Sequence, residues 1–363
     1  MVCPVAGLWT SIVRLPVEGT QRPPMKFESG GASMRRVYAV YWPSPTVKKR
    51  TLLTFAQCVA FATALSCAGP AAPSTSPPTP QPPVPPTPPV PITCSTPGVS
   101  CFGRNNFIEY VPGDLPIVIS VPHGGALTPA SIPDRTLGTS TTDLNTIDLG
   151  RAISAALASR SARVPHLVIV HLRRTKLDAN REITEAAAGN ADAIQAWNEY
   201  HAFIEQAMAA VELQSGTGLY IDLHGHGHAK QRLELGYLLS ASTLDGTNAQ
   251  LDAPAVASAS SLRLIAQSSP LLFSDLLRGP ASLGGFLQPD VASVPSPSIP
   301  TPGADDYFSG GYSTSRHTTR LPGLQIECNF SGVRDTANNR ASFAGRLAQA
   351  LALFAQTHLS LKF

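Results

Sequence analysis

The sequence predicts an α/β domain in which a mixed, largely parallel sheet is sandwiched by helices. Short apolar runs, typical of buried strands, alternate with longer segments whose apolar residues recur every three to four positions. Strands that alternate with helices favour parallel pairing, with helices on both faces of the sheet. The expected strands are 115–121, 168–172, 218–221 and 324–327, and the expected helices are 145–158, 191–213 and 339–358. Residues 241–309, rich in Ala, Ser, Pro and Gly, are expected to be a loop-rich insertion at the rim of a cleft.

The domain is expected to occupy only residues 94–363. Residues 68–93 consist mostly of Pro, Ser, Thr and Ala, a composition that cannot bury a core and predicts an extended linker. Residues 34–67 are expected to be a signal peptide, and residues 1–33 resemble neither a signal nor a domain. Because Met34 precedes two arginines, it is a plausible true start.

The proposed signal has a basic stretch followed by an uncharged run. The 16 residues from Thr51 to Ser66 are short for a membrane-spanning helix and fit the apolar part of a signal peptide. Cys67 comes next, at a position that resembles a bacterial lipoprotein attachment site, and ordinary cleavage nearby is the alternative. The protein is therefore expected to be exported to the periplasm or cell envelope, with a membrane tether through Cys67 as an option.

Removal of residues 1–67 would change the sign of the net charge. The full chain has a formal net charge of +3, but this segment holds eight basic and two acidic residues. The remainder has a net charge of −3, and nothing in it suggests nucleic-acid binding. Of the cysteines left, Cys94 and Cys101 could close a small disulfide loop, whereas Cys328 is expected to be a buried free thiol.

Two histidine segments follow predicted strands. Pro122-His123-Gly124-Gly125 comes after one, and Asp222-Leu223-His224-Gly225-His226-Gly227-His228 comes after another. Ligands bind at this edge of open α/β sheets, and imidazole is the commonest protein ligand of zinc. A catalytic zinc needs three protein ligands, so an Asp or Glu from a nearby loop is expected to join. The alternatives are a surface loop rich in histidine and a core histidine hydrogen-bonded to Asp222.

A cluster of cations follows the predicted strand 168–172. The stretch from Arg173 to Arg181 contains Arg174, Lys176 and Asn180 as well. Arginine binds carboxylates through two parallel hydrogen bonds, so the stretch is suited to reading an anion. The alternative is a solvated basic loop in which Asp178 neutralises Arg181.

Taken together, these motifs resemble the N-formylglutamate amidohydrolase family, which is related to zinc carboxypeptidase and aspartoacylase-like hydrolases. The likeness spans roughly residues 115–330, and five motifs occur in the family's order. These are Pro122-His123-Gly124-Gly125, Arg174 with Asp178-Ala179-Asn180-Arg181, the 222–228 segment, Glu234-Leu235-Gly236-Tyr237 and Gln325-Ile326-Glu327. The resemblance implies a zinc-carboxypeptidase-like fold, one zinc ion, a metal-activated water, a glutamate general base and arginines for a substrate carboxylate.

The resemblance also implies a role for individual residues. His123 and His224 match zinc ligands, and Ala126 stands where zinc carboxypeptidases carry their carboxylate ligand. The third ligand is sought further along, where Asp143 aligns better than Asp148. If Asp143 is not a ligand, it is expected to cap the following helix. The residues implied in catalysis are Glu327 and Arg174, and those implied in substrate binding are Arg173, Asn180, Arg181 and Tyr312.

The function implied is hydrolysis of an amide bond in an N-acyl amino acid or peptide that bears a free carboxylate. If Glu327 is not the base, it is a strand-end glutamate in a salt bridge. Gly310, Gly311, Tyr312 and His317 are expected in a flap over the site, and His201 is expected to pack within a helix. Two further hypotheses are a non-catalytic, envelope-anchored ligand-binding protein on the same fold, and a metal-binding module built on His224, His226 and His228.

Overall fold

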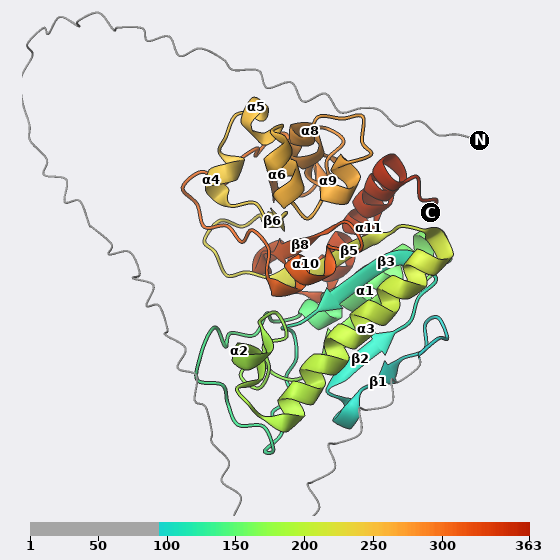
Figure 1. Cartoon of the computed structure of the whole chain (residues 1–363), viewed down its shortest axis with the longest axis vertical. Helices are drawn as coiled ribbons and strands as arrows, with labels where there is room; N and C mark the ends of the chain where they lie inside the picture. The colour runs from blue at the N-terminus through green and yellow to red at the C-terminus, as the bar shows by residue number, and fades with distance from the viewer. Residues whose placement is uncertain (1–93) are drawn as a thin grey trace, which may run out of the picture. The chain divides into compact units, whose positions relative to one another are not determined.

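The structure, a computed structural model, describes residues 94–363, which belong to one compact unit of the chain (Figure 1). The expected signal peptide, the linker and the alternative start at Met34 all lie outside the described residues. Within the described part, no helix is both long and apolar enough to cross a membrane.

The centre of the domain is a mixed sheet of eight strands in the order β1-β2-β4-β3-β5-β8-β6-β7. Strands β4, β3, β5 and β8 are parallel neighbours, whereas β2 and β6 run antiparallel to β4 and β8. The mixed, largely parallel sheet predicted from the sequence is therefore confirmed. The strands are β1 Cys101–Phe102, β2 Ile108–Val111, β3 Leu115–Val121, β4 Pro165–Val170, β5 Leu219–Gly225, β6 Leu233–Gly236, β7 Ser293–Val294 and β8 Gly323–Cys328.

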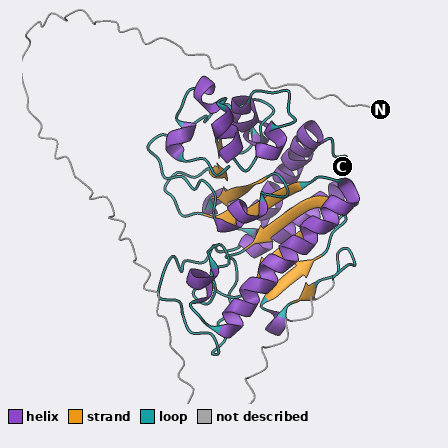
Figure 2. Cartoon of the chain, in the orientation of Figure 1, coloured by secondary structure: helices purple, strands orange, loops and turns teal. Residues whose placement is uncertain are grey.

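Three long helices cover the two faces of the sheet. In Figure 1, α3 crosses the near face, and α1 and α11 pack against each other on the other face (see also Figure 2). The side chain of Asn190 caps the start of α3, and Gly216 ends it with a positive φ of 71°. These helices are α1 Thr146–Ser161, α3 Ala191–Ser215 and α11 Ala337–Leu359, close to the predicted ranges, and two short ones are α2 Ile183–Ala187 and α10 Tyr312–His317.

Alternate residues of the strands enter two different hydrophobic cores. In β3, Ile117 and Ile119 join the core beneath α1 and α11, whereas Val118 joins the core beneath α3. The first core receives apolar residues along the full length of β5 and β8. On the opposite face, the carboxyl ends of β3, β5 and β8 carry polar side chains, which are Ser120, Asp222, His224, Gln325 and Glu327. The change from apolar to polar places a site on this face, at the strand ends.

The insertion at 241–309 differs from its expected loop-rich character. It holds six short helices, and their leucines extend the core beneath α1 and α11, as with Leu244, Leu251 and Leu276. Helices of four to six residues, three of them capped by Ser or Thr, are too short to show the periodicity that predicts a helix from sequence. The helices are α4 Ala241–Leu244, α5 Asn248–Leu251, α6 Pro254–Ala259, α7 Arg263–Ala266, α8 Phe273–Arg278 and α9 Leu283–Leu287.

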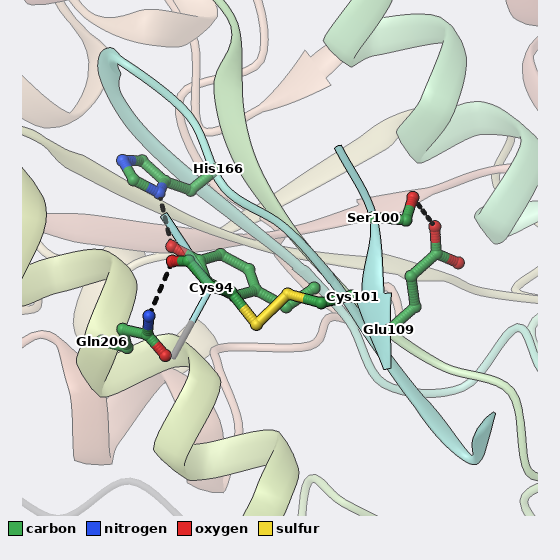
Figure 3. Close-up of a disulfide and its surroundings, with 7 residues drawn as sticks. Cys94, Ser100, Cys101, Glu109, His166 and Gln206 are labelled. Atoms are coloured by element: carbon green, nitrogen blue, oxygen red, sulfur yellow. Dashed lines mark hydrogen bonds between the residues drawn. A yellow bond between two sulfur atoms is a disulfide. The ribbon is translucent and has the colours of Figure 1, made fainter. Parts of the chain in front are cut away.

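The cysteines are arranged as the sequence suggested. Cys94 and Cys101 form a disulfide, and Gln206 from α3 donates a hydrogen bond of 2.7 Å to the carbonyl of Cys94 (Figure 3). This ties the start of the described chain to the helix that covers the sheet. Cys328 is a buried free thiol, and burial raises its pKa well above the usual value.

Candidate metal centre

Three side chains from distant parts of the chain meet at the carboxyl ends of β3 and β5. His123 lies just after β3, His224 lies near the end of β5, and Asp143 belongs to the loop before α1. The two Nδ1 atoms are 3.1 Å apart, and each lies 3.4 Å from Oδ2 of Asp143. All three side chains are buried, so their polar atoms face one another rather than solvent.

The other ring nitrogen of each histidine contacts a buried carboxylate. Nε2 of His123 lies 2.7 Å from Oδ1 of Asp178, and Nε2 of His224 lies 3.2 Å from Oδ1 of Asp222. A carboxylate at Nε2 favours the proton on that nitrogen and leaves the Nδ1 lone pair directed at the centre. Both rings are therefore oriented with their metal-binding atom inward.

Asp178 is held in a strongly polar environment. It accepts hydrogen bonds from Nε of Arg174 at 3.0 Å and from the backbone N–H of Asn180 at 3.1 Å. Burial alone would raise its pKa, but attraction to His123 and Arg174 outweighs this effect and keeps the pKa below its usual value. Asp178 therefore stays ionised and can orient His123.

Asp222 orients His224 in the same way as Asp178 orients His123. It lies within β5, where its side chain shares a face with His224 because residues two apart point the same way. Its two oxygens accept hydrogen bonds of 2.9 Å from the hydroxyls of Ser120 and Thr314. Asn180 also approaches, with Nδ2 3.4 Å from Nε2 of His224.

The structure distinguishes between the two aspartates considered as third ligand. Asp143 does not cap α1, because Asn145 occupies that position. Instead, Oδ2 of Asp143 accepts a hydrogen bond from the backbone N–H of Gly225. Asp148 lies on α1 with an exposed side chain and forms an ion pair with Arg340 at 3.6 Å. Only Asp143 reaches the histidine pair.

This set of donors fits a divalent transition metal. Donors about 2.0–2.1 Å from a tetrahedral zinc ion are separated from one another by about 3.3 Å. The observed separations of 3.1 and 3.4 Å agree with that spacing. Three protein ligands also leave one position open, as in catalytic rather than structural zinc sites.

Glu327 borders the centre on the next strand. It is the direct partner of His224 in the register of β5 and β8, so the two side chains lie on the same face. Its Oε1 accepts a hydrogen bond of 3.0 Å from Gln325. Among residues 94–363, it forms no ion pair with Lys or Arg, contrary to the salt-bridge alternative. Burial raises the pKa of Glu327 to about 8.

A cavity of about 370 Å³ opens over these residues. The expected substrate-binding residues Asn180 and Arg181 line it, as does Arg174, which was expected to act in catalysis. Arg181 contacts Glu185 through Nε at 3.3 Å and donates one N–H of Nη1 to the carbonyl of Asn180, which leaves Nη2 and the second N–H of Nη1 available for a carboxylate. Gly310 and Gly311 line the cavity as well, consistent with their expected place over the site.

Two of the expected site residues do not line the cavity. Arg173 is exposed where the chain enters a turn, whereas the next residue, Arg174, is buried and lines the cavity. Tyr312 starts α10 and packs near the rings of Trp197 and His201. His201 is buried in α3, as expected of a packing residue.

One part of the cavity wall was not predicted from the sequence. His228 lines this part of the cavity. Its Nδ1 lies 2.8 Å from Oε1 of the buried Glu234 of β6. Phe308 lines the same wall, and its ring stacks on His228 with centroids 4.5 Å apart. The alternation of Glu234 with Leu233 and Leu235 was the available signal, since it places the carboxylate on the face opposite the apolar core.

Comparison with known proteins gave structural neighbours only. The sequence matches no established family profile and no curated protein. One similar solved structure is an N-formylglutamate amidohydrolase from Ralstonia eutropha JMP134, with 13% identity and a TM-score of 0.42 over 70% of this chain and 98% of that one. Another is a gene product of Agrobacterium tumefaciens, with 14% identity and a TM-score of 0.39 over 67% and 91%.

Proposed function

We propose that this protein is a metal-dependent hydrolase that cleaves the amide bond of an N-acyl amino acid or peptide carrying a free carboxylate. The observation that carries the proposal is the convergence of His123, Asp143 and His224, with both imidazoles oriented by buried carboxylates. A general-base candidate and an arginine with unused donors border the same cavity. The resemblance of the sequence motifs to N-formylglutamate amidohydrolases supports the same reaction class.

His123, Asp143 and His224 would hold one metal ion, for which zinc is the best match to the donors. When bound, such an ion acidifies water and acts as a Lewis acid toward a carbonyl oxygen. The protein's contribution is to keep both Nδ1 atoms unprotonated and aligned, which Asp178 and Asp222 do through the opposite ring nitrogens.

Glu327 is the proposed general base. Burial favours its protonated form, but the positive charge of a bound metal ion would favour the ionised form that a base requires. As the attacking water adds to the amide carbon, one oxygen of Glu327 accepts a proton, which it then delivers to the departing nitrogen. Its position beside His224 places it next to the reacting centre, and the hydrogen bond from Gln325 to Oε1 leaves Oε2 for this exchange.

The arginines take two separate parts. Arg181 is the proposed anchor for the substrate carboxylate, because its Nη2 is available at the cavity wall. Arg174 is buried, with its Nε bound to Asp178 and its Nη1 3.6 Å from Asp143. It holds both carboxylates in place and adds positive charge where an oxyanion would form.

The test combines metal analysis with one isosteric substitution. Purified protein loaded with zinc should contain one ion per chain and hydrolyse members of a panel of N-acyl amino acids and short peptides. Glu327→Gln keeps the size of the side chain but cannot accept a proton. It should retain the metal while losing at least ~100-fold in kcat. Near-normal turnover by Glu327→Gln would show that Glu327 is not the base. Absence of metal binding by the unmodified protein would refute the proposal as a whole.

The two remaining hypotheses predict different outcomes. A non-catalytic binding protein would bind carboxylate ligands without turnover, yet the presence of Glu327 beside the centre favours a reaction. A metal-binding module would use His224, His226 and His228 together. In the structure, His224 groups with His123 and Asp143, whereas His226 and His228 group with Glu234. Metal titration of the His226→Ala protein distinguishes the two hypotheses. The hydrolase proposal expects unchanged metal affinity, whereas the metal-binding module expects weaker binding.

Export is a separate proposal that rests on residues 34–93 of the sequence. Cell fractionation should find the protein in the periplasm or envelope. Labelling with radioactive palmitate should mark the protein only if Cys67 is present, so Cys67→Ala is the control. Label on neither protein would leave ordinary signal cleavage as the account of the export signal, and label on both would exclude Cys67 as the attachment site.

A further inference from the structure

The cavity has a second polar wall that the proposed reaction does not use. His224, Glu327 and Glu234 are register partners across β5, β8 and β6, so their side chains form one row on the same face. Neighbouring strands are about 4.8 Å apart, which places Glu234 about 10 Å from His224 across the sheet. Arg181 lines the same cavity and belongs to the loop after β4, a strand that lies beyond β3 from β5 in the sheet order, whereas β8 and β6 lie on the other side of β5.

His228 is held firmly at the far end of this row. Its Nδ1 lies 2.8 Å from Oε1 of Glu234, whose Oε2 accepts the backbone N–H of Phe308 at 2.7 Å. Because both oxygens of this buried carboxylate accept hydrogen bonds, Nδ1 of His228 is the donor and carries the proton. In the neutral ring, Nε2 is then an acceptor, and it forms no hydrogen bond to residues 94–363.

Phe308 makes the wall flat and fixes its position. The rings of Phe308 and His228 are inclined by 26° with centroids 4.5 Å apart. The segment carrying Phe308 is fastened to β6 by hydrogen bonds from Tyr307 to Leu235 and from Leu238 to Ser309. A planar group of a ligand can therefore lie against this wall, with a hydrogen-bond donor directed at Nε2 of His228.

We infer that His228, Glu234 and Phe308 form a subsite for an extended acyl group that carries an N–H donor, as in a peptide. This inference rests on the proposed function, because it takes Arg181 as the carboxylate anchor. With the carboxylate on one side of the centre, the acyl group must extend to the other side, where His228 lies. A formyl group contributes one carbon and carries no N–H donor of its own, so it cannot contact Nε2 of His228. The preferred substrates are thus peptides or N-acylated dipeptides rather than formyl amino acids.

The experiment measures binding, so it does not depend on turnover. The full-length Glu327→Gln protein, with and without zinc, is titrated calorimetrically with N-acetyl-alanyl-alanine and with its analogue methylated on the acetamide nitrogen. N-formyl-alanine is the third ligand. Loss of one neutral hydrogen bond should weaken the methylated ligand about 5- to 10-fold. Adding His228→Ala should abolish this difference between the first two ligands.

His171→Ala is the matched control, because His171 forms a comparable pair with the buried Glu109 at 2.8 Å but does not line the cavity. It should leave the difference between the ligands intact. If N-formyl-alanine binds as tightly as the acetylated dipeptide, or if the methylation effect survives in His228→Ala, the inference is wrong even though the hydrolase proposal stands. If none of the three ligands binds to zinc-loaded protein, both fail together.

Discussion

Asp222→Asn tests whether the buried carboxylates control the metal centre. Asp222 is fully buried and contacts Nε2 of His224 at 3.2 Å and the hydroxyls of Ser120 and Thr314 at 2.9 Å. Asparagine has nearly the same shape. The hydroxyl that faces its NH2 group can turn to accept, and the other can still donate to its oxygen, so the fold should be preserved. Only the negative charge opposite the imidazole is lost.

The expected loss in zinc affinity is about 10- to 100-fold, which corresponds to roughly 1.4–2.7 kcal/mol. The upper end applies if the amide nitrogen faces His224. Nε2 would then become the acceptor, and the proton would move to Nδ1, the atom that must bind the metal. The charge loss alone, with the amide oxygen facing His224, gives the lower end.

Competition with a chelating zinc indicator measures this affinity directly. Thermal unfolding with and without zinc gives a second measure, since the stabilisation depends on the ratio of free zinc to Kd. Asp148→Asn is the matched control, because Asp148 is exposed and far from the histidines. If Asp222→Asn binds zinc within twofold of the unmodified protein while Asp143→Asn has lost it, the orienting role of Asp222 is refuted.

Two further predictions concern the substrate anchor and the response to acid. Arg181→Lys should raise KM about 10-fold with little change in kcat, because an ammonium cannot form the paired contact to a carboxylate, and an unchanged KM would exclude Arg181 as the anchor. Burial lowers the pKa of His166 from 6.5 to about 4, and its Nδ1 accepts hydrogen bonds from Tyr110 and Gly113. Below pH 6.5 the His166 imidazole of the unfolded chain takes up a proton, whereas that of the folded protein stays neutral until about pH 4. The contribution of His166 to the free energy of unfolding is therefore complete above pH 6.5 and is lost as the pH falls toward 4. Urea unfolding should show a loss of roughly 2 kcal/mol from this residue between about pH 7.5 and about pH 5, and a His166→Gln protein with the same slope would contradict the assignment.

The sequence was sufficient for the apolar parts of the fold and insufficient where polar residues interrupt the strands. Residues 115–121 were predicted as a strand and form β3, because every side chain except Ser120 is apolar. The predicted strand 218–221 ends too early, since β5 continues to Gly225 and contains Asp222 and His224. Functional polar residues at a strand end hide the pattern that marks the strand.

The candidate site was predicted in the same uneven way. His123 and His224 were found because each follows a recognisable strand. Asp143 was preferred to Asp148 only through the resemblance, because no local pattern distinguishes the two. Three-dimensional placement shows that one side chain faces the histidines and the other faces solvent. His228 and Glu234 were missed as a pair because a turn and an antiparallel strand bring them together.

The opposite polarity of the two sheet faces has a consequence for how this domain can change over evolutionary time. Leu223 and Ile326 are fully buried beneath α1 and α11, whereas their immediate neighbours His224 and Glu327 face the cavity. A substitution on the cavity side therefore leaves the larger core untouched and does not draw on its stabilising contacts. Mutations that alter ligand preference can accumulate there while the core continues to supply the stability that tolerance of new mutations requires.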